Sequence, residues 1–298
     1  MSRPRRLLLL FLDGVGIGPD DPGRNPFLRA RLPVLRDLLG DSLPTTSSPG
    51  PSSGPARIWP LDATLETPGT PQSGTGQTSL LTGRNAARLF GRHFGPWTPV
   101  KLRPLLSREN LFQRALERGL SVAFANAYPR GWAESRAARF PAAPPLAAHT
   151  SGLLVRHAQE LARGEAVASG ILNDGWREHL GRDVPVIEAV EAGRNLARIA
   201  SDHRLTVYAH YDTDLAGHTG EMPAAVEALE RVDRFVGGVL HGLPPEAALL
   251  VASDHGNLED VTEQHTRNPA LGLWVGDDPP GAASIAEVAG AALTWLEG

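Results

Sequence analysis

Carboxylate and imidazole side chains occur at three places where an apolar run of the sequence ends. Asp13 follows the first run, Asp214 and His218 follow a later one, and Asp254 and His255 are adjacent at the end of another. Aspartate and histidine are ligands that divalent transition metals accept, and the chain has no cysteine that could supply a thiolate. In an open α/β sheet, ligands bind beyond the carboxyl ends of the strands. We therefore expect these five residues to converge on a metal site.

The spacing within each group fits metal binding but is not specific by itself. Asp214 and His218 are four residues apart, which places both on one face of a helical turn, where they can share one ion. His265 follows the Asp254-His255 pair by ten residues, yet a lone histidine is more often a surface or core residue. Asp13 alone could equally be an acidic residue in a glycine-rich turn. The prediction of a metal site rests on the groups taken together, because three of the 10 histidines fall in these positions.

A loop rich in Gly, Ser and Thr leads into a helical pattern and brings a hydroxyl to a helix start. Residues 71–84 read Pro-Gln-Ser-Gly-Thr-Gly-Gln-Thr-Ser-Leu-Leu-Thr-Gly-Arg, and we expect the helix to begin at Thr78. Free N–H groups and the helix dipole favour negative charge at that position, so a hydroxyl there could become a phosphate ester. The alternative is that Thr78 simply caps the helix, which is a common role for threonine.

The elements that must position these residues alternate between short apolar runs and helical patterns, which is typical of an α/β fold. The continuous apolar character of the runs indicates a central, mostly parallel sheet with helices on both faces. The predicted strands are Leu7–Leu12, Ala56–Leu61, Ser121–Ala125, Leu205–His210, Ala247–Ala252 and Leu271–Val275. The predicted helices are Pro33–Leu39, Thr78–Leu89, Leu111–Arg118, Ser151–Arg163, Val186–Ser201, Ala224–Leu240 and Ile285–Leu296.

Composition and charge exclude several classes of partner. The 298 residues carry a formal net charge of −4 and 41% hydrophobic residues, which indicates a globular protein with no basic patch for nucleic acid. The six-residue apolar run after Arg5-Arg6 is too short for a signal peptide, since an acidic residue follows it at once. No other stretch is long enough to span a membrane. Together with the absence of cysteine, this favours a cytoplasmic protein.

Two stretches of the chain break the α/β rhythm. Residues 44–55 are rich in Pro, Gly and Ser, and we expect a mobile surface loop there, of which residues 48–53 lie outside the described residues. Residues 128–185 contain the run Phe-Pro-Ala-Ala-Pro-Pro and one or two helical patterns. We expect this stretch to form a small insertion or cap, with residues 1–127 and 186–298 forming the metalloenzyme core.

In order and spacing, these residues resemble the metalloenzyme core of the alkaline phosphatase superfamily, especially cofactor-independent phosphoglycerate mutase and phosphopentomutase. The motifs that carry the resemblance are Leu12-Asp13-Gly14, Gly76-Gln77-Thr78, Asp214-x-x-x-His218, Ser253-Asp254-His255-Gly256-Asn257 and His265-Thr266. The resemblance covers about two thirds of the chain and implies an alkaline phosphatase-like fold. It implies two divalent ions, Mn or Zn. One would be held by Asp13, Thr78, Asp254 and His255, and the other by Asp214, His218 and His265.

The resemblance also implies phosphoryl transfer on a small phosphorylated substrate, with Thr78 as the nucleophile. We expect a phosphatase or phosphodiesterase, because residues 128–185 are short for a lid that would exclude water. The alternative is a phosphomutase. Arg84, Arg92 and Lys101 follow the nucleophile and are candidates for binding the substrate phosphate, although surface charge is the commoner role. The sequence names neither the substrate nor the oligomeric state.

Overall fold

The computed structural model describes residues 4–47 and 54–298, and its centre is a six-stranded sheet with the order β2-β6-β5-β1-β4-β3. All six predicted strands are present, with ends that differ from the predicted ones by at most one residue. Their bounds are β1 Arg6–Leu12, β2 Ala56–Leu61, β3 Val122–Phe124, β4 Leu205–His210, β5 Ala247–Ser253 and β6 Ala270–Val275.

The sheet is mostly parallel, as the apolar runs predicted. Strand β1 pairs in parallel with β4 on one side and with β5 on the other, and β3 adds to β4 in parallel. Strand β6 runs antiparallel to both β5 and β2. The register places Leu12 opposite His210 of β4 and opposite Ser253 of β5. The carboxyl ends of three neighbouring strands therefore lie side by side.

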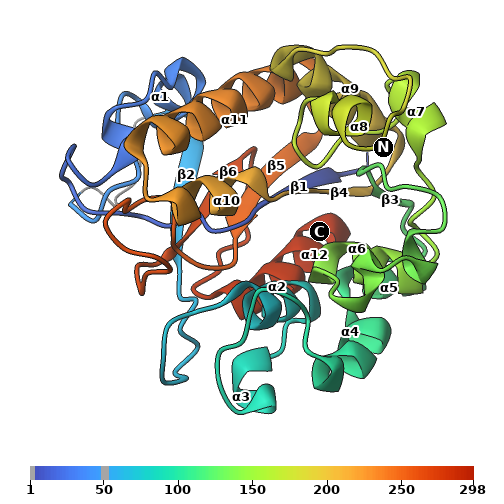
Figure 1. Cartoon of the computed structure of the whole chain (residues 1–298), viewed down its shortest axis with the longest axis horizontal. Coiled ribbons are helices and arrows are strands. Elements are labelled where there is room, and N and C mark those ends of the chain that lie inside the picture. The colour runs from blue at the N-terminus through green and yellow to red at the C-terminus, as the bar shows by residue number, and fades with distance from the viewer. Residues whose placement is uncertain (1–3, 48–53) are drawn as a thin grey trace.

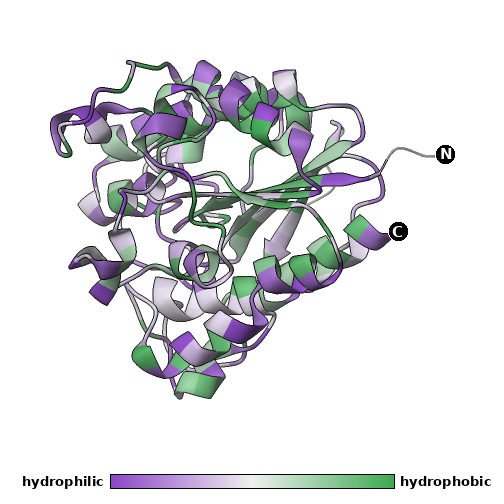
Figure 2. Cartoon of the chain, turned by 90° about the vertical axis from the view of Figure 1, so that its right-hand side faces the viewer, coloured by the Kyte–Doolittle hydropathy of each residue, from purple (hydrophilic) through white to green (hydrophobic). Residues whose placement is uncertain are grey.

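Helices cover both faces of this sheet (Figure 1). On one face, helices α9 and α11 pack against each other and against strand residues such as Leu8, Leu10 and Tyr208. On the other face, α2, α5, α6 and α12 pack against Leu7, Leu9 and Phe11. Figure 2 shows the strands as mainly hydrophobic, between helices whose hydrophilic residues face outward. Successive residues of β1 thus enter opposite cores, which explains its unbroken apolar sequence.

Several helices begin or end away from their predicted positions. The predicted helix 78–89 is two helices separated at Gly83, and the first of them begins at Ser73 rather than at Thr78. The predicted helix 151–163 is wrong, because α6 ends at Thr150 and α7 spans only 158–162. The helix bounds are α1 Pro33–Leu39, α2 Ser73–Thr82, α3 Ala86–Phe90, α4 Arg103–Glu109, α5 Leu111–Glu117, α6 Ala143–Thr150, α7 Ala158–Ala162, α8 Asp174–Glu178, α9 Ala189–Asp202, α10 Asp212–Thr219, α11 Met222–Gly242 and α12 Val288–Glu297.

The stretch 128–185 contains short helices and loops and divides between two environments. Helix α6 packs into the main core beneath the sheet through Ala143, Ala147 and Ala148. Further along, Leu161, Trp176 and neighbouring side chains form a small separate cluster at the β3 edge. The division of the chain at 128 and 185 stays a prediction, but part of the predicted cap clearly belongs to the core. No helix in the described ranges is long and apolar enough to cross a membrane.

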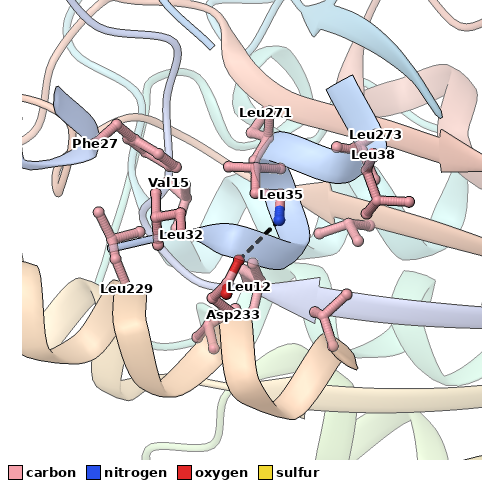
Figure 3. Close-up of a pocket in the computed structure, with 13 residues that line it drawn as sticks. Leu12, Val15, Phe27, Leu32, Leu35, Leu38, Leu229, Asp233, Leu271 and Leu273 are labelled. Atoms are coloured by element: carbon pink, nitrogen blue, oxygen red, sulfur yellow. Dashed lines mark hydrogen bonds between the residues drawn. The ribbon is translucent and has the colours of Figure 1, made fainter. Parts of the chain in front are cut away.

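A buried carboxylate joins helix α1 to helix α11. Asp233 of α11 accepts hydrogen bonds from the backbone N–H groups of Val34, at 3.2 Å, and Leu35, at 2.9 Å, in the first turn of α1. It lines a cavity of about 60 Å³ whose other walls are leucine, valine and phenylalanine side chains (Figure 3). Since α1 has no side-chain cap of its own, Asp233 fills that role from another element.

Replacing Asp233 tests this cap. We expect Asp233→Ala to lower the free energy of unfolding by about 1–3 kcal/mol, because two partly buried N–H groups lose their acceptor. Asp233→Asn keeps one acceptor oxygen and should cost less. Urea unfolding in the presence of EDTA measures both, with the exposed Asp20→Ala as control. Equal stability of wild type and Asp233→Ala would contradict the role.

Candidate metal centre

The residues predicted from the three strand ends do converge. Asp13 directly follows β1, Asp214 lies in the first turn of α10 just after β4, and Asp254 directly follows β5. The backbone N–H of Asp13 donates to the carbonyl of His210 at 3.0 Å, which continues the β1–β4 pairing past the strand ends. Parallel pairing of β1 with both neighbours is therefore what brings these three carboxylates to one place.

One group of donors comprises Asp214, His218 and His265. The Nε2 atoms of His218 and His265 lie 3.1 Å apart, and each lies near a carboxylate oxygen of Asp214, at 3.2 Å and 3.6 Å respectively. One donor atom from each of the three residues falls within a 4.8 Å cluster. The four-residue spacing of Asp214 and His218 thus places both on one face of a helical turn, as predicted from the sequence. The predicted second ligand set is brought together in full.

The other group of donors surrounds His255. Its Nε2 atom lies 3.4 Å from Asp13 Oδ1 and 3.6 Å from Asp254 Oδ2. Asp13, Asp214 and His255 also offer donor atoms within 4.8 Å of one another. The ring of His255 stacks on that of His265, with centroids 4.1 Å apart. The two groups are therefore adjacent, and Asp214 belongs to both.

The hydroxyl at this centre belongs to Ser73. Ser73 is the first residue of α2, and its Oγ lies 2.9 Å from Nε2 of His255. Among the described residues, no backbone carbonyl accepts from the N–H groups of Ser73 and Gly74, so both are available at the helix start. Unpaired N–H groups and the positive end of the helix dipole make this a suitable place for phosphoryl oxygens.

Thr78 does not occupy the predicted position. It lies in the second turn of α2, and its Oγ1 donates to the carbonyl of Gly74 at 2.7 Å, within the helix. The prediction that Thr78 begins the helix is wrong, because the helix starts five residues earlier. A threonine whose hydroxyl is used by its own helix neither caps it nor faces the acidic cluster. We therefore assign to Ser73 the place that the sequence analysis gave to Thr78.

Side chains around the centre hold its carboxylates in place. Gln77, one turn after Ser73, donates to Asp13 Oδ2 at 2.9 Å. Asn257 donates to Asp214 Oδ1 at 2.7 Å, and Nδ1 of His218 lies 2.6 Å from Gln264 Oε1. Hydrogen bonds of this kind fix the orientation of ligand side chains around a metal.

Two glycines allow the elements to approach this closely. Gly14 has a φ of +66°, and a Cβ at that position would lie 2.4 Å from an oxygen of Asp214. A Cβ on Gly76 would lie 2.9 Å from the carbonyl of Asp254. Side chains at either place would push α10 or α2 away from the centre.

Burial and mutual charge shift the pKa of these groups in opposite directions. Burial raises the pKa of Asp13, and burial together with the charge of Asp13 raises that of Asp254 well above its usual value. Burial opposes a charge on His255, but Asp254 and Asp13 overcome it and raise the His255 pKa to about 10. Burial likewise opposes ionisation of Asp214, yet His265 and His255 lower its pKa to about 2. The carboxylates thus need nearby positive charge.

The donor set fits divalent metal ions. Oδ1 of Asp13 and Oδ2 of Asp254 are buried without a hydrogen-bond partner among the described residues. Buried carboxylate oxygens of this kind are normally paired or bound to metal. Three carboxylates and three imidazoles within reach of each other match the oxygen and nitrogen ligands of Mn and Zn.

The three basic residues considered as candidates for binding the phosphate make other contacts, in line with the commoner role of surface charge. Arg84 is at the opposite end of α2 from Ser73 and forms an ion pair with Glu109 at 2.7 Å. Lys101 donates to the carbonyl of Phe90, and the guanidinium of Arg92 lies over the ring of Phe94. These three side chains follow residues 71–84 closely in the sequence, but the contacts described for them are not with residues of the centre.

Comparison with known proteins supports the reading of this centre. Residues 182–289, which include Asp214, His218, Asp254, His255 and His265, match the sequence model of the Metalloenzyme superfamily. Over its full length the fold resembles that of alkaline phosphatase from the Antarctic bacterium TAB5, with a TM-score of 0.52, 11% identity and 99% of both chains covered. The family-model match over residues 182–289 and this fold together support an alkaline phosphatase-superfamily metalloenzyme. The PH0037 protein from Pyrococcus horikoshii shares the fold with a TM-score of 0.60, 13% identity and coverage of 99% and 98%.

Sequence relatives of this chain include phosphoglycerate mutases. The 2,3-bisphosphoglycerate-independent phosphoglycerate mutase of Rhodopseudomonas palustris is 33% identical over 121 residues, which are 37% of this chain and 22% of the relative. The protein of that name from Methanopyrus kandleri is 34% identical over 126 residues, or 38% and 30%. The chain thus matches less than a third of the length of these relatives.

Sequence reasoning missed Ser73, Gln77, Asn257 and Gln264. A signal for Ser73 was available, since it precedes Gly-Thr-Gly and a serine at a helix start is as common as a threonine. The three amides gave no signal of their own, because their role depends on which carboxylate or imidazole each one meets in the fold.

The shared position of Asp214 generates a prediction about metal content. Asp214→Asn should lower the bound metal by more than one ion per chain, because both donor groups lose a carboxylate. His218→Ala should lose about one ion. Elemental analysis after dialysis against Mn measures this, with Asp212→Asn on the same helix as the matched control. Two ions retained by Asp214→Asn would contradict the shared role.

Proposed function

We propose that this protein transfers the phosphoryl group of a small phosphate ester to Ser73, with the help of two divalent ions. The observation that carries the proposal is the position of the Ser73 hydroxyl, 2.9 Å from His255 Nε2 and at the start of a helix that faces three carboxylates. This arrangement combines an available nucleophile, an anion-binding helix end and a donor set for metal.

Ser73, Asp13, Asp254 and His255 would hold one ion, and His218 and His265 the other, with Asp214 within reach of both. When bound, such ions lower the pKa of a hydroxyl and neutralise the charge on phosphoryl oxygens. The chain itself supplies orientation. Gln77 and Asn257 fix two of the carboxylates, and the N–H groups of Ser73 and Gly74, to which no described backbone carbonyl is bonded, would donate to phosphoryl oxygens.

In the proposed reaction, a bond forms between Ser73 Oγ and phosphorus while the ester P–O bond breaks. The organic group leaves as an alcohol after taking up a proton. The phosphoserine then needs an acceptor, which decides between a hydrolase and a mutase.

Water is the acceptor that the geometry supports best. The side chain of His218 is 40% exposed, so solvent reaches one side of the centre. Solvent at this position can compete for the phosphoserine and release inorganic phosphate. The expected class is therefore a phosphatase.

A phosphomutase is the second candidate, and the names of the sequence relatives favour it. A mutase must return the phosphoryl group to the organic portion before water reacts. The relatives match this chain over less than a third of their length, so their activity enters only as a proposal.

Variants of two hydroxyl residues in one helix test the nucleophile. Ser73→Ala should reduce turnover by at least about a thousandfold, because a covalent step cannot occur without the hydroxyl. Thr78→Ser keeps the hydrogen bond to Gly74 and should retain activity. The measurements are release of phosphate from an aryl phosphate with Mn, and the mass of the Ser73 peptide after acid quenching. A labelled Thr78 peptide in place of Ser73 would overturn the assignment.

Phosphorus NMR distinguishes transfer of the phosphoryl group to water from its return to the organic portion of the substrate. The protein is incubated with Mn and, in separate samples, 3-phosphoglycerate, ribose 5-phosphate and a simple alkyl phosphate. The hydrolase proposal expects an inorganic phosphate signal that grows with the loss of ester. An isomerised phosphate ester without free phosphate would identify a mutase instead.

A further inference from the structure

A groove borders α10, the helix that also carries Asp214 and His218 of the proposed phosphoryl-transfer centre. It has a volume of about 570 Å³ and lies between α10 and the segment 127–180, with Arg231 of α11 also in its wall. Sites for small organic ligands typically have volumes of about 300–1,000 Å³. The groove is therefore large enough to take the organic portion of a phosphate ester.

Helix α10 connects the groove to the metal centre. Leu215 lines the groove, while its sequence neighbour Asp214 and His218, three residues further on, face the centre. Residues three apart are neighbours on a helix surface, so the groove wall begins beside the exposed side of His218. A ligand in the groove would thus lie next to the solvent-accessible part of the centre.

Ser169, which forms the floor of the groove, contacts the end of β4, the strand that precedes Asp214. The carbonyl of Ser169 accepts from the hydroxyl of Tyr208, at 3.2 Å, and lies 2.7 Å from Nδ1 of His210. Both residues belong to the carboxyl-terminal end of β4, beside the strand that Asp13 follows. The floor and the centre therefore share one rigid support.

The wall of the groove is mainly apolar. Leu215 is 62% exposed and Leu180 is 44% exposed, and both line the groove together with Leu172, Tyr128 and Trp176. Large leucine side chains left exposed in a concave site beside a reactive centre are typical of ligand binding.

The charges in the groove disfavour an anionic ligand. Arg231 is the one arginine or lysine among the described lining residues, and it already contacts Asp212 at 3.6 Å and Glu227 at 2.8 Å. Asp212 and Asp174 place carboxylates in the wall. A substrate with a carboxylate, such as a phosphoglycerate, would meet no unpaired guanidinium here.

We propose that this groove binds the organic portion of the substrate, and that this portion is an uncharged aromatic or aliphatic group. The inference rests on the phosphoryl-transfer function proposed above, and it adds the substrate class. The phosphoryl group would lie at Ser73, and the apolar group would extend along Leu215 toward Leu180 and Trp176.

Phosphonates test the groove without requiring turnover. We would measure the binding of 4-phenylbutylphosphonate, butylphosphonate and 4-carboxybutylphosphonate to the Mn-loaded protein by calorimetry. All three carry the same head group, whose C–P bond prevents transfer. The phenyl compound should bind about tenfold more tightly than butylphosphonate or better, because its ring leaves water. The carboxylate compound should bind more weakly than butylphosphonate.

Leucine variants assign the effect to the groove. The double variant Leu180→Ser, Leu215→Ser should bring the affinities for the phenyl and butyl compounds close together. Leu116→Ser, a change at a leucine of 40% exposure on α5, should leave the ratio as in the wild type. All three leucines are exposed, so the fold should persist, which circular dichroism checks.

Equal affinity for the phenyl and butyl compounds, or a preference that survives in the double variant, overturns the groove proposal. Absence of binding does so as well. Phosphorylation of Ser73 is followed separately. Phosphorylation without phenyl preference supports the proposed function and contradicts the groove proposal. Phenyl preference without phosphorylation supports the groove proposal and contradicts the proposed function.

Discussion

Three carboxylates lie close together at the centre of this protein, and their mutual repulsion is the constraint that the surrounding structure must satisfy. Asp13, Asp214 and Asp254 are all buried, and like charges repel strongly where water is scarce. Burial and the neighbouring negative charge raise the pKa of Asp254, which indicates that bare carboxylates are unfavourable there. Positive charge from imidazoles and from metal ions relieves this repulsion, so the site and its charge balance depend on each other.

The elements that hold the three carboxylates together are a regular sheet and regular helices. Parallel pairing of β1 with β4 and β5 delivers the three carboxylates without strain in the strands. Gly14 and Gly76 allow two helices to approach, and Gln77 and Asn257 hold the carboxylates that the approach brings together. The same sheet edge also anchors the floor of the neighbouring groove through Tyr208 and His210.

The sheet could be predicted well because most of its strands are largely apolar runs buried on both faces. Strand β2, which alternates between buried and exposed residues, is the exception. The metal ligands of α10 could be predicted because Asp214 and His218 follow a strand with helical spacing. The start of α2 could not, since both Ser73 and Thr78 are acceptable first residues and the choice depends on packing. Thr75 N–H donates to the carbonyl of Phe94, a contact between segments that the local sequence does not contain. Helix α6 was missed because Pro144 and Pro145 in its first turn resemble a loop.

The central position of β1 has a consequence for how the chain is made. Leu7 pairs with Leu205 and Arg6 pairs with Ala247, so this apolar strand is synthesised long before either of its partners. At ribosomal rates of about 5–20 residues per second, this strand waits roughly 10–40 s before its first neighbour emerges. Throughout that interval β1 lacks both strands that pair with its backbone, although helices such as α2 and α5, which pack against Leu7 and Leu9, are made earlier. In a nascent chain of this topology, the backbone groups of β1 therefore stay without their native strand partners until the C-terminal half is made.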